Sequence, residues 1–191
     1  MNSFSKLIII LPALCFCFHA GAQPLGDLTI RRGMKPFFLG SLRTELDSSY
    51  RLRDAGTTEY KGRTEYSYVY TPTPDSLYFA GGVYFKNIML TYISDTLVRI
   101  HLENTYTPFL YPDYEKRAKQ EFRELRKFLR EQWNSPGKEK TFIRTPDNRI
   151  VSKGLQWDDG SMVMKASFYE DKDKTHPLYS IYIELNLQAY E

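Results

Sequence analysis

The stretch "LVRIHLE" (97–103) carries side chains that could do chemistry. Arg99, His101 and Glu103 share one row with Leu97 and alternate with Val98, Ile100 and Leu102. An imidazole and a carboxylate are groups that serve in general acid–base catalysis. Alternate side chains of a strand share a face and lie ~6.6 Å apart, so Arg99 and Glu103 can flank His101 without bonding to it. The pattern indicates the solvated face of an antiparallel sheet, with a partner-binding face and a catalytic site as alternatives.

Signals for other chemistries are weak in this sequence. There is no G-x-S-x-G nucleophile elbow and no Gly-rich phosphate loop. His101 and His176 lie far apart in the chain, so we predict no metal site and no cofactor. Asp159-Gly160 suits a tight hairpin turn better than a calcium loop, because the alternating acids of such a loop are missing. No set of catalytic residues is therefore predicted.

The first 22 residues predict an exported protein. Lys6 precedes an apolar run from Leu7 to Phe18, and Ala20-Gly21-Ala22 forms a small-x-small cleavage site. This is the layout of a signal peptide, and the run is shorter than the about 20 residues that span a bilayer. Both cysteines lie in this segment, so residues 23–191 cannot form disulfides. We expect a periplasmic or extracellular protein without a transmembrane segment.

The charge balance gives no reason to expect a nucleic-acid partner. Removing residues 1–22 removes one lysine and no acid, so 25 of the 26 basic residues face 23 acidic ones. The 15 tyrosines favour a folded, strand-rich chain. The partner expected from this balance and from export is another protein or a component of the cell envelope, and the sequence does not indicate an oligomeric state.

Hydrophobic periodicity predicts strands, one long helix and one short helix. The long helix is expected from Asp113, as its cap, to about Trp133, and the short helix lies within 36–46 with Ser41 as its cap. Alternation predicts strands at 64–70, 83–93, 97–106, 140–144, 151–157, 161–169 and 179–188. The strands at 83–93 and 97–106 should form a hairpin.

These elements predict an α+β fold, in which one long and one short helix pack on an antiparallel sheet. Residues 23–191 are expected to form a single domain. Two interpretations of its order stay open. One is a tandem αββββ repeat with halves 36–106 and 107–191. The other is a meandering sheet without a repeat.

The element order and the stretch "GGVYFKNIMLTYISDTLVRI" (81–100) give the chain a family resemblance. It resembles the beta-lactamase inhibitor protein-like architecture, and a single unit resembles outer-membrane assembly lipoproteins of the SmpA/OmlA type. The resemblance implies a sheet covered by helices and a role in protein binding. The sequence departs from those lipoproteins because neither Cys15 nor Cys17 follows a small residue, as a lipidated cysteine would.

The long helix has an apolar stripe and a basic stripe. The apolar stripe holds Ala118, Phe122, Leu125 and Leu129 at spacings of four, three and four. At ~100° per residue, six basic residues fall in another stripe, and they are Lys116, Lys119, Arg123, Arg126, Lys127 and Arg130. This stripe is either a solvated face paired with nearby acids or a docking face for an acidic partner, centred on Lys119, Arg123 and Lys127.

The row of Tyr66, Tyr68 and Tyr70 is a third candidate surface. These tyrosines alternate with Glu65, Ser67 and Val69. They are expected to face the core with their hydroxyls at its rim, with an exposed recognition surface as the alternative.

Together these observations predict an exported, non-enzymatic binding protein that uses its sheet face or its basic helix face. A periplasmic carrier of a small ligand or lipid is one alternative. The other is an envelope hydrolase that uses His101 and a carboxylate brought close by the fold.

Overall fold

The structure is a computed structural model that describes residues 33–34, 37–46, 50–71, 78–143, 151–171 and 177–190. The predicted signal peptide (1–22) and His176 lie outside these residues.

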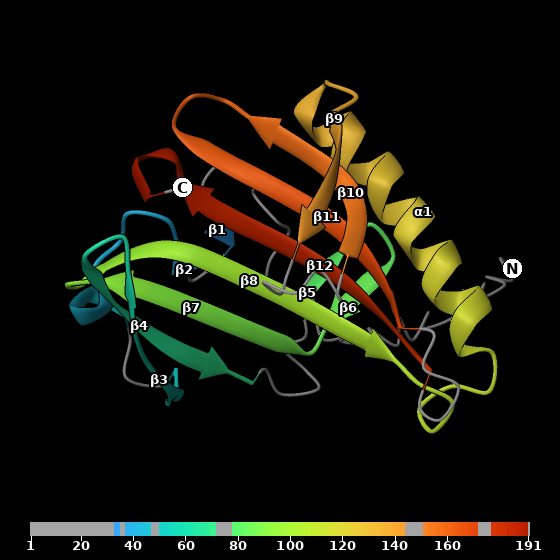
Figure 1. The fold of residues 1–191 in the computed structure, drawn as a ribbon, viewed down its shortest axis with the longest axis horizontal. Coiled ribbons are helices and arrows are strands. Elements are labelled where there is room, and N and C mark those ends of the chain that lie inside the picture. The colour runs from blue at the N-terminus through green and yellow to red at the C-terminus, as the bar shows by residue number, and fades with distance from the viewer. Residues whose placement is uncertain are drawn as a thin grey trace, which may run out of the picture.

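One antiparallel sheet of eight strands dominates the fold, as Figure 1 shows. Its spatial order is β3-β4-β7-β8-β12-β11-β10-β9, so β8 and β12 join the four strands of the first half of the chain to the four of the second. The strands span Leu52–Tyr60 (β3), Arg63–Tyr70 (β4), Asn87–Ile93 (β7), Thr96–Tyr106 (β8), Lys138–Ile143 (β9), Val151–Asp158 (β10), Met162–Asp171 (β11) and Leu178–Leu187 (β12). The predicted antiparallel sheet is confirmed.

One side of this sheet is covered by α1 and a small hairpin (Figure 1). The helix α1 (Tyr114–Trp133) packs on β12, β8 and β6, and it ends at Asn134, whose φ is 47°. The remaining elements are β1 (Gly33–Met34), β2 (Phe37–Phe38), η1 (Arg43–Glu45), the hairpin strands β5 (Tyr78–Ala80) and β6 (Val83–Phe85), and η3 (Gln188–Tyr190).

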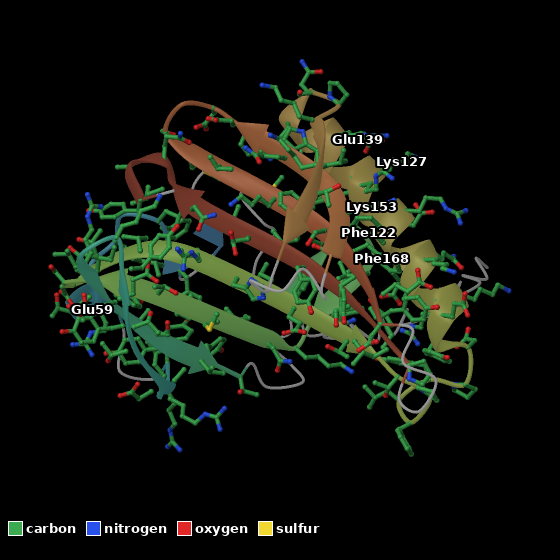
Figure 2. All side chains as sticks on the ribbon, viewed as in Figure 1. Glu59, Phe122, Lys127, Glu139, Lys153 and Phe168 are labelled. Carbon is green, nitrogen blue, oxygen red and sulfur yellow. The ribbon has the colours of Figure 1, made fainter. Side chains whose placement is uncertain are left out.

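The core lies between the sheet and α1. Leu102, Ile183, Ala166 and Leu155 face one another in register across four strands, and none is exposed. The helix contributes the predicted apolar stripe, of which Ala118, Leu125 and Leu129 are fully buried. Phe122 stacks on Phe168 of β11 at a ring distance of 5.3 Å, and Figure 2 shows both side chains beside α1.

A hydrogen bond ties the first half of α1 to the sheet. The buried Tyr106 hydroxyl donates to Glu121 Oε2 at 2.5 Å. Burial raises the pKa of the Tyr106 phenol above its ordinary value, and the Glu121 carboxylate raises it further. The phenol therefore stays protonated and keeps this bond throughout the usual pH range.

The predicted α+β class is wrong, because the fold is mostly antiparallel sheet with one α-helix in its described part. The short helix was predicted within 36–46, but residues 37–46 instead contain β2 and the single turn η1. Phe37 and Leu39 are both buried, which is the period of a strand, and Gly40 follows with φ of 87°. The αββββ unit is consequently missing from the described residues of the first half.

Two details of the strand prediction also need correction. Residues 83–93 break at Lys86 into β6 and β7, and β6 leaves the large sheet to pair with β5. In β8, Thr91 faces Arg99 but Tyr92 faces Leu97, so Val98 is the extra residue of a β-bulge. The bulge turns Leu97 into the core, where it is fully buried, and separates it from the row that the alternation predicted.

Candidate functional site

The side of the sheet opposite α1, which we call the polar face, holds the row that the sequence predicted. Arg99, His101 and Glu103 lie on this face, opposite Thr91, Met89 and Asn87 of β7. On the other side of β8, the same three residues face Asn186, Glu184 and Tyr182 of β12. The alternation of β8 after its bulge therefore places these side chains together, as predicted.

Glu184 is the carboxylate that the fold brings to His101. Its Oε2 lies 3.7 Å from His101 Nδ1, and its Oε1 lies 3.4 Å from Lys165 Nζ of β11. Asn186 Nδ2 donates a hydrogen bond of 2.9 Å to the same Oε1. The carboxylate thus sits among three donor groups.

These donors control the ionisation of Glu184. Burial alone would raise its pKa, but the contact with His101, the hydrogen bond from Asn186 and the charge of Lys165 outweigh burial and hold the pKa well below the ordinary value. Glu184 is therefore an ionised acceptor at neutral pH. It is poorly suited to exchange protons there, because an effective acid or base has a pKa near the working pH.

This lowered pKa predicts how Glu184→Gln changes stability with pH. A carboxyl whose pKa is lower in the folded state stabilises the protein above its unfolded-state pKa of about 4.3 and loses that effect as the pH falls below it. We expect the variant to be about 1–3 kcal/mol less stable than the parent at pH 7. The difference should shrink below about pH 4.3.

Urea unfolding of both proteins across this pH range measures the difference. Glu139→Gln serves as the control, because the Glu139 side chain is 81% exposed and its pair with Arg126 contributes about 1 kcal/mol or less. A difference between parent and Glu184→Gln that stays constant with pH would show that Glu184 is not selectively stabilised in its ionised form.

Beside Glu184 the polar face contains a hollow of about 350 Å³. It is lined by His101, Thr141, Phe142, Ser152, Lys165, Ser167, Tyr182 and Glu184. These residues come from β8 and β9 and from the three strands between them. In a flat sheet β8 and β9 would stand about 19 Å apart, so the sheet must curl toward its polar face to bring both into one hollow. In Figure 1, β9 lies at the edge of the sheet, where it pairs with β10 and overlaps β11 in the view.

Small residues on β10 and β11 leave room for the hollow. Gly154 faces Ser167 on β11 and Lys140 on β9, and Ser152 follows on the same face. A Cβ atom on Gly154 would lie 2.7 Å from Ser167 Cα and would also collide with the Ala166 carbonyl group. This position accommodates glycine alone because β10 approaches β11 so closely here.

Ser152, which lines this hollow, carries a buried hydroxyl group without a hydrogen-bond partner in the described part of the chain. Its side chain is 1% exposed. A buried hydroxyl without a partner costs about 1–3 kcal/mol, so folded proteins rarely retain one without a reason.

Arg99 has a structural role next to the hollow. Its guanidinium contacts both oxygens of Glu65 at 3.2 and 3.4 Å and donates through Nε to Asn186 Oδ1 at 2.9 Å. Since Glu65 is 5% exposed, Arg99 neutralises a buried carboxylate. Glu103, the third member of the row, accepts a hydrogen bond from the Thr105 hydroxyl at 3.1 Å.

The three tyrosines of β4 point to the opposite side of the sheet and do not join the polar face. Tyr70 is buried and packs edge-on against Phe37, and Tyr68 packs against Tyr92 and accepts a hydrogen bond from Arg43. Tyr66 is 40% exposed. The row therefore runs from the core to the surface, which is partly the arrangement that we predicted.

Neighbouring groups engage half of the basic stripe of α1. Lys119 pairs with Glu115, Arg126 with Glu139, and Arg130 donates to the Pro136 carbonyl. Lys116, Arg123 and Lys127 are exposed, and among the described residues no ion pair with them is found. Figure 2 labels Lys127 on the helix.

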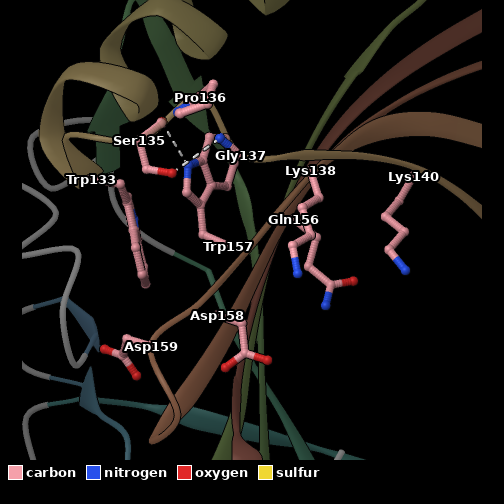
Figure 3. Close-up of a pocket in the computed structure, with 10 residues that line it drawn as sticks. All are labelled: Trp133, Ser135, Pro136, Gly137, Lys138, Lys140, Gln156, Trp157, Asp158 and Asp159. Atoms are coloured by element: carbon pink, nitrogen blue, oxygen red, sulfur yellow. Dashed lines mark hydrogen bonds between the residues drawn. The ribbon is translucent and has the colours of Figure 1, made fainter.

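A second hollow, of about 650 Å³, lies where α1 ends and β9 begins (Figure 3). Trp133 and Trp157 stand together at one side, with Lys138, Lys140 and Gln156 at the other. The Trp157 indole N–H donates to the Ser135 carbonyl, and the ring packs directly on Gly137. Trp157 is only 3% exposed, so its ring holds the helix end against β10 and offers little surface to a ligand.

Sequence reasoning found His101 but missed Glu184, Lys165, Ser152 and Phe142. The alternation of Tyr182 and Glu184 with Ile181 and Ile183 was visible and could have placed both on a polar face. Nothing in the sequence, however, gives the register between β8 and β12, which sets Glu184 opposite His101.

Within the described ranges, no three His, Cys, Asp or Glu side chains gather so that they could hold a metal ion. Among the same residues, α1 included, no helix combines the length and the apolar character that crossing a bilayer requires.

In the part of the chain that the structure describes, the fold and the site define an antiparallel-sheet protein with one covering helix and a hollow in its polar face. A comparison with models of known families, with curated proteins and with solved structures finds no match for this chain.

Proposed function

We propose that this chain is an exported, non-enzymatic binding protein that holds a component of the bacterial envelope at the hollow of its polar face. The observation that carries this function is the buried Ser152 hydroxyl, which lines the hollow and lacks a partner among the described residues. A ligand in the hollow would supply that partner. The signal-like segment at 1–22 supports export.

The same contacts favour binding over hydrolysis. Glu184 is held ionised by three donors, so its role is that of an acceptor. Among the described residues no serine hydroxyl hydrogen-bonds to His101, whereas a serine nucleophile needs a base within reach. A carrier of apolar ligands is less well supported, because all but one of the residues that line the hollow carry a polar group.

Blocking the hollow tests this function. Ser167 faces Gly154, where no side chain competes for space, so Ser167→Met should fill the hollow with a flexible chain. Ser67→Met is the matched control, because Ser67 lies on β4, on the polar face of the sheet but outside the hollow. The full chain, with its own leader and a C-terminal tag, is used to capture components from envelope extract.

We expect the parent and Ser67→Met to retain the same envelope component and Ser167→Met to lose it. A Lys119→Glu, Arg123→Glu, Lys127→Glu variant tests the helix face and should bind as the parent does. If Ser167→Met still retains the envelope component, the hollow is not the binding site. If the helix variant loses the component, the binding site is on α1 instead. Turnover of envelope material that His101→Ala abolishes would establish a hydrolase instead.

A further inference from the structure

On the basis of the proposed function, we infer that the hollow is a subsite for one neutral, polyhydroxylated ring, namely a sugar unit of an envelope glycan. The inference rests on the size of the hollow, on the Phe142 ring in its lining and on the pairing of its charges.

The hollow has the shape and size of a site for a single ring. Ser152 of β10 lies opposite Phe142 of β9, and Ser167 of β11 lies opposite Tyr182 of β12, and all four residues line the hollow. The volume of about 350 Å³ is near the lower end of the roughly 300–1,000 Å³ typical of ligand pockets. The half-buried Phe142 ring offers an apolar face to the C–H groups of a sugar, which no small anion has, whereas Tyr182 is buried and packs against His101 at a ring distance of 5.4 Å.

The charges in the hollow are paired. Lys165 Nζ lies 3.4 Å from Glu184 Oε1, so the two charges largely cancel. An anion would meet the Glu184 carboxylate, and a cation would meet the Lys165 ammonium. A neutral ligand avoids both repulsions, which favours it over a phosphate or a metal ion.

The polar groups offer donors and acceptors within one small space. Ionised Glu184 only accepts, the Lys165 ammonium only donates, and the hydroxyls of Ser152 and Ser167 can do both. Ligand hydroxyls also do both, so one ring with several hydroxyls can satisfy this mixed set. The Ser152 hydroxyl is buried and has no hydrogen-bond partner within the described chain. A ligand hydroxyl would supply that missing hydrogen bond.

Ser152→Ala separates this role from a structural one. Because the Ser152 hydroxyl has no partner among the described residues, its removal should leave stability unchanged or raise it. The same change should weaken sugar binding about fivefold, the effect of one lost hydrogen bond. Ser67→Ala is the matched control on the same face and should alter neither property.

Amide chemical shifts of the full chain report binding. D-glucose, D-galactose, D-mannose, L-rhamnose and N-acetyl-D-glucosamine are titrated separately to high millimolar concentration, with inorganic phosphate as the anionic probe. We expect at least one sugar to shift amides of β9–β12 around Ser152 and Phe142, and Ser152→Ala to weaken that response. Shifts there with phosphate alone would overturn the inference and assign an anion site.

The remaining outcomes separate this inference from the proposed function. If no sugar shifts these amides while Ser167→Met still loses its envelope component, the sugar inference fails and the proposed function stands. If no sugar binds and Ser167→Met still retains the envelope component, the sugar inference and the proposed function both fail. Equal sugar affinity in the parent and Ser152→Ala would also overturn the assigned role of Ser152.

Discussion

Replacing Arg99 with methionine is expected to lower the free energy of unfolding by about 3 kcal/mol at neutral pH. The change removes the cation that contacts both oxygens of Glu65 and leaves that carboxylate 5% exposed and without a counter-charge. Breaking a buried ion pair costs about 3–5 kcal/mol. We expect the lower end, because the Arg99 side chain is 24% exposed and water can partly replace it.

Urea unfolding at constant ionic strength measures this loss. Arg43→Met is the matched control, because Arg43 pairs with Asp95 at 3.5 Å with both side chains about a third or more exposed. That variant should lose about 1 kcal/mol or less. A Glu65→Gln, Arg99→Met double variant should recover much of the stability, since it leaves no buried charge. Equal losses for Arg99→Met and Arg43→Met would mean that Glu65 is effectively solvated.

Gly81→Ala is expected to destabilise the protein by about 2–4 kcal/mol, because two costs combine at this turn. Gly81 has φ of 52°, which L residues rarely adopt, and it joins β5 to β6 directly above α1. An added Cβ would lie 2.8 Å from Leu125 Cα and 2.8 Å from Phe128 Cβ. The hairpin would have to move away from the helix and open the core beneath it.

Gly62→Ala isolates the steric part of this effect. Gly62 has φ of 72° in the turn between β3 and β4, and nothing lies within 4 Å of its Cβ position. That variant should carry only the backbone cost of about 1–2 kcal/mol. The additional loss in Gly81→Ala, read from urea or thermal unfolding, is the cost of separating the hairpin from α1. The same loss in both variants would show that the hairpin is not tightly packed on the helix.

Both predictions concern contacts that hold the polar face and the core in place on either side of one sheet. Arg99 fixes β8 to β4 and β12 beside the hollow, and Gly81 lets the β5–β6 hairpin close over the helix side. Loss of either contact should therefore weaken ligand binding only through stability, whereas Ser152→Ala should weaken binding alone. This contrast would distinguish residues that support the hollow from a residue that contacts the proposed ligand.

The local features of this protein follow from its amino-acid sequence alone. Alternation placed Arg99, His101 and Glu103 on one strand face, and the 3.6-residue period placed Ala118, Leu125 and Leu129 on the buried side of a helix. These patterns depend on neighbours within one element, so they can be read without knowing the fold. The short helix at 36–46 was predicted wrongly because Phe37 and Leu39 follow the period of a strand.

Which strands lie next to each other depends on the three-dimensional fold. Arg99 and Asn186 are 87 residues apart in the chain, and the register of β8 with β12 brings them together and sets Glu184 beside His101. The bulge at Val98 and the close approach of β10 to β11 at Gly154 likewise depend on neighbouring strands. Strand pairing joins residues that are distant in the chain, so the hydrophobic period within one strand does not specify it. The hollow depends on this pairing, because the curled sheet brings β8 and β9 to the same site.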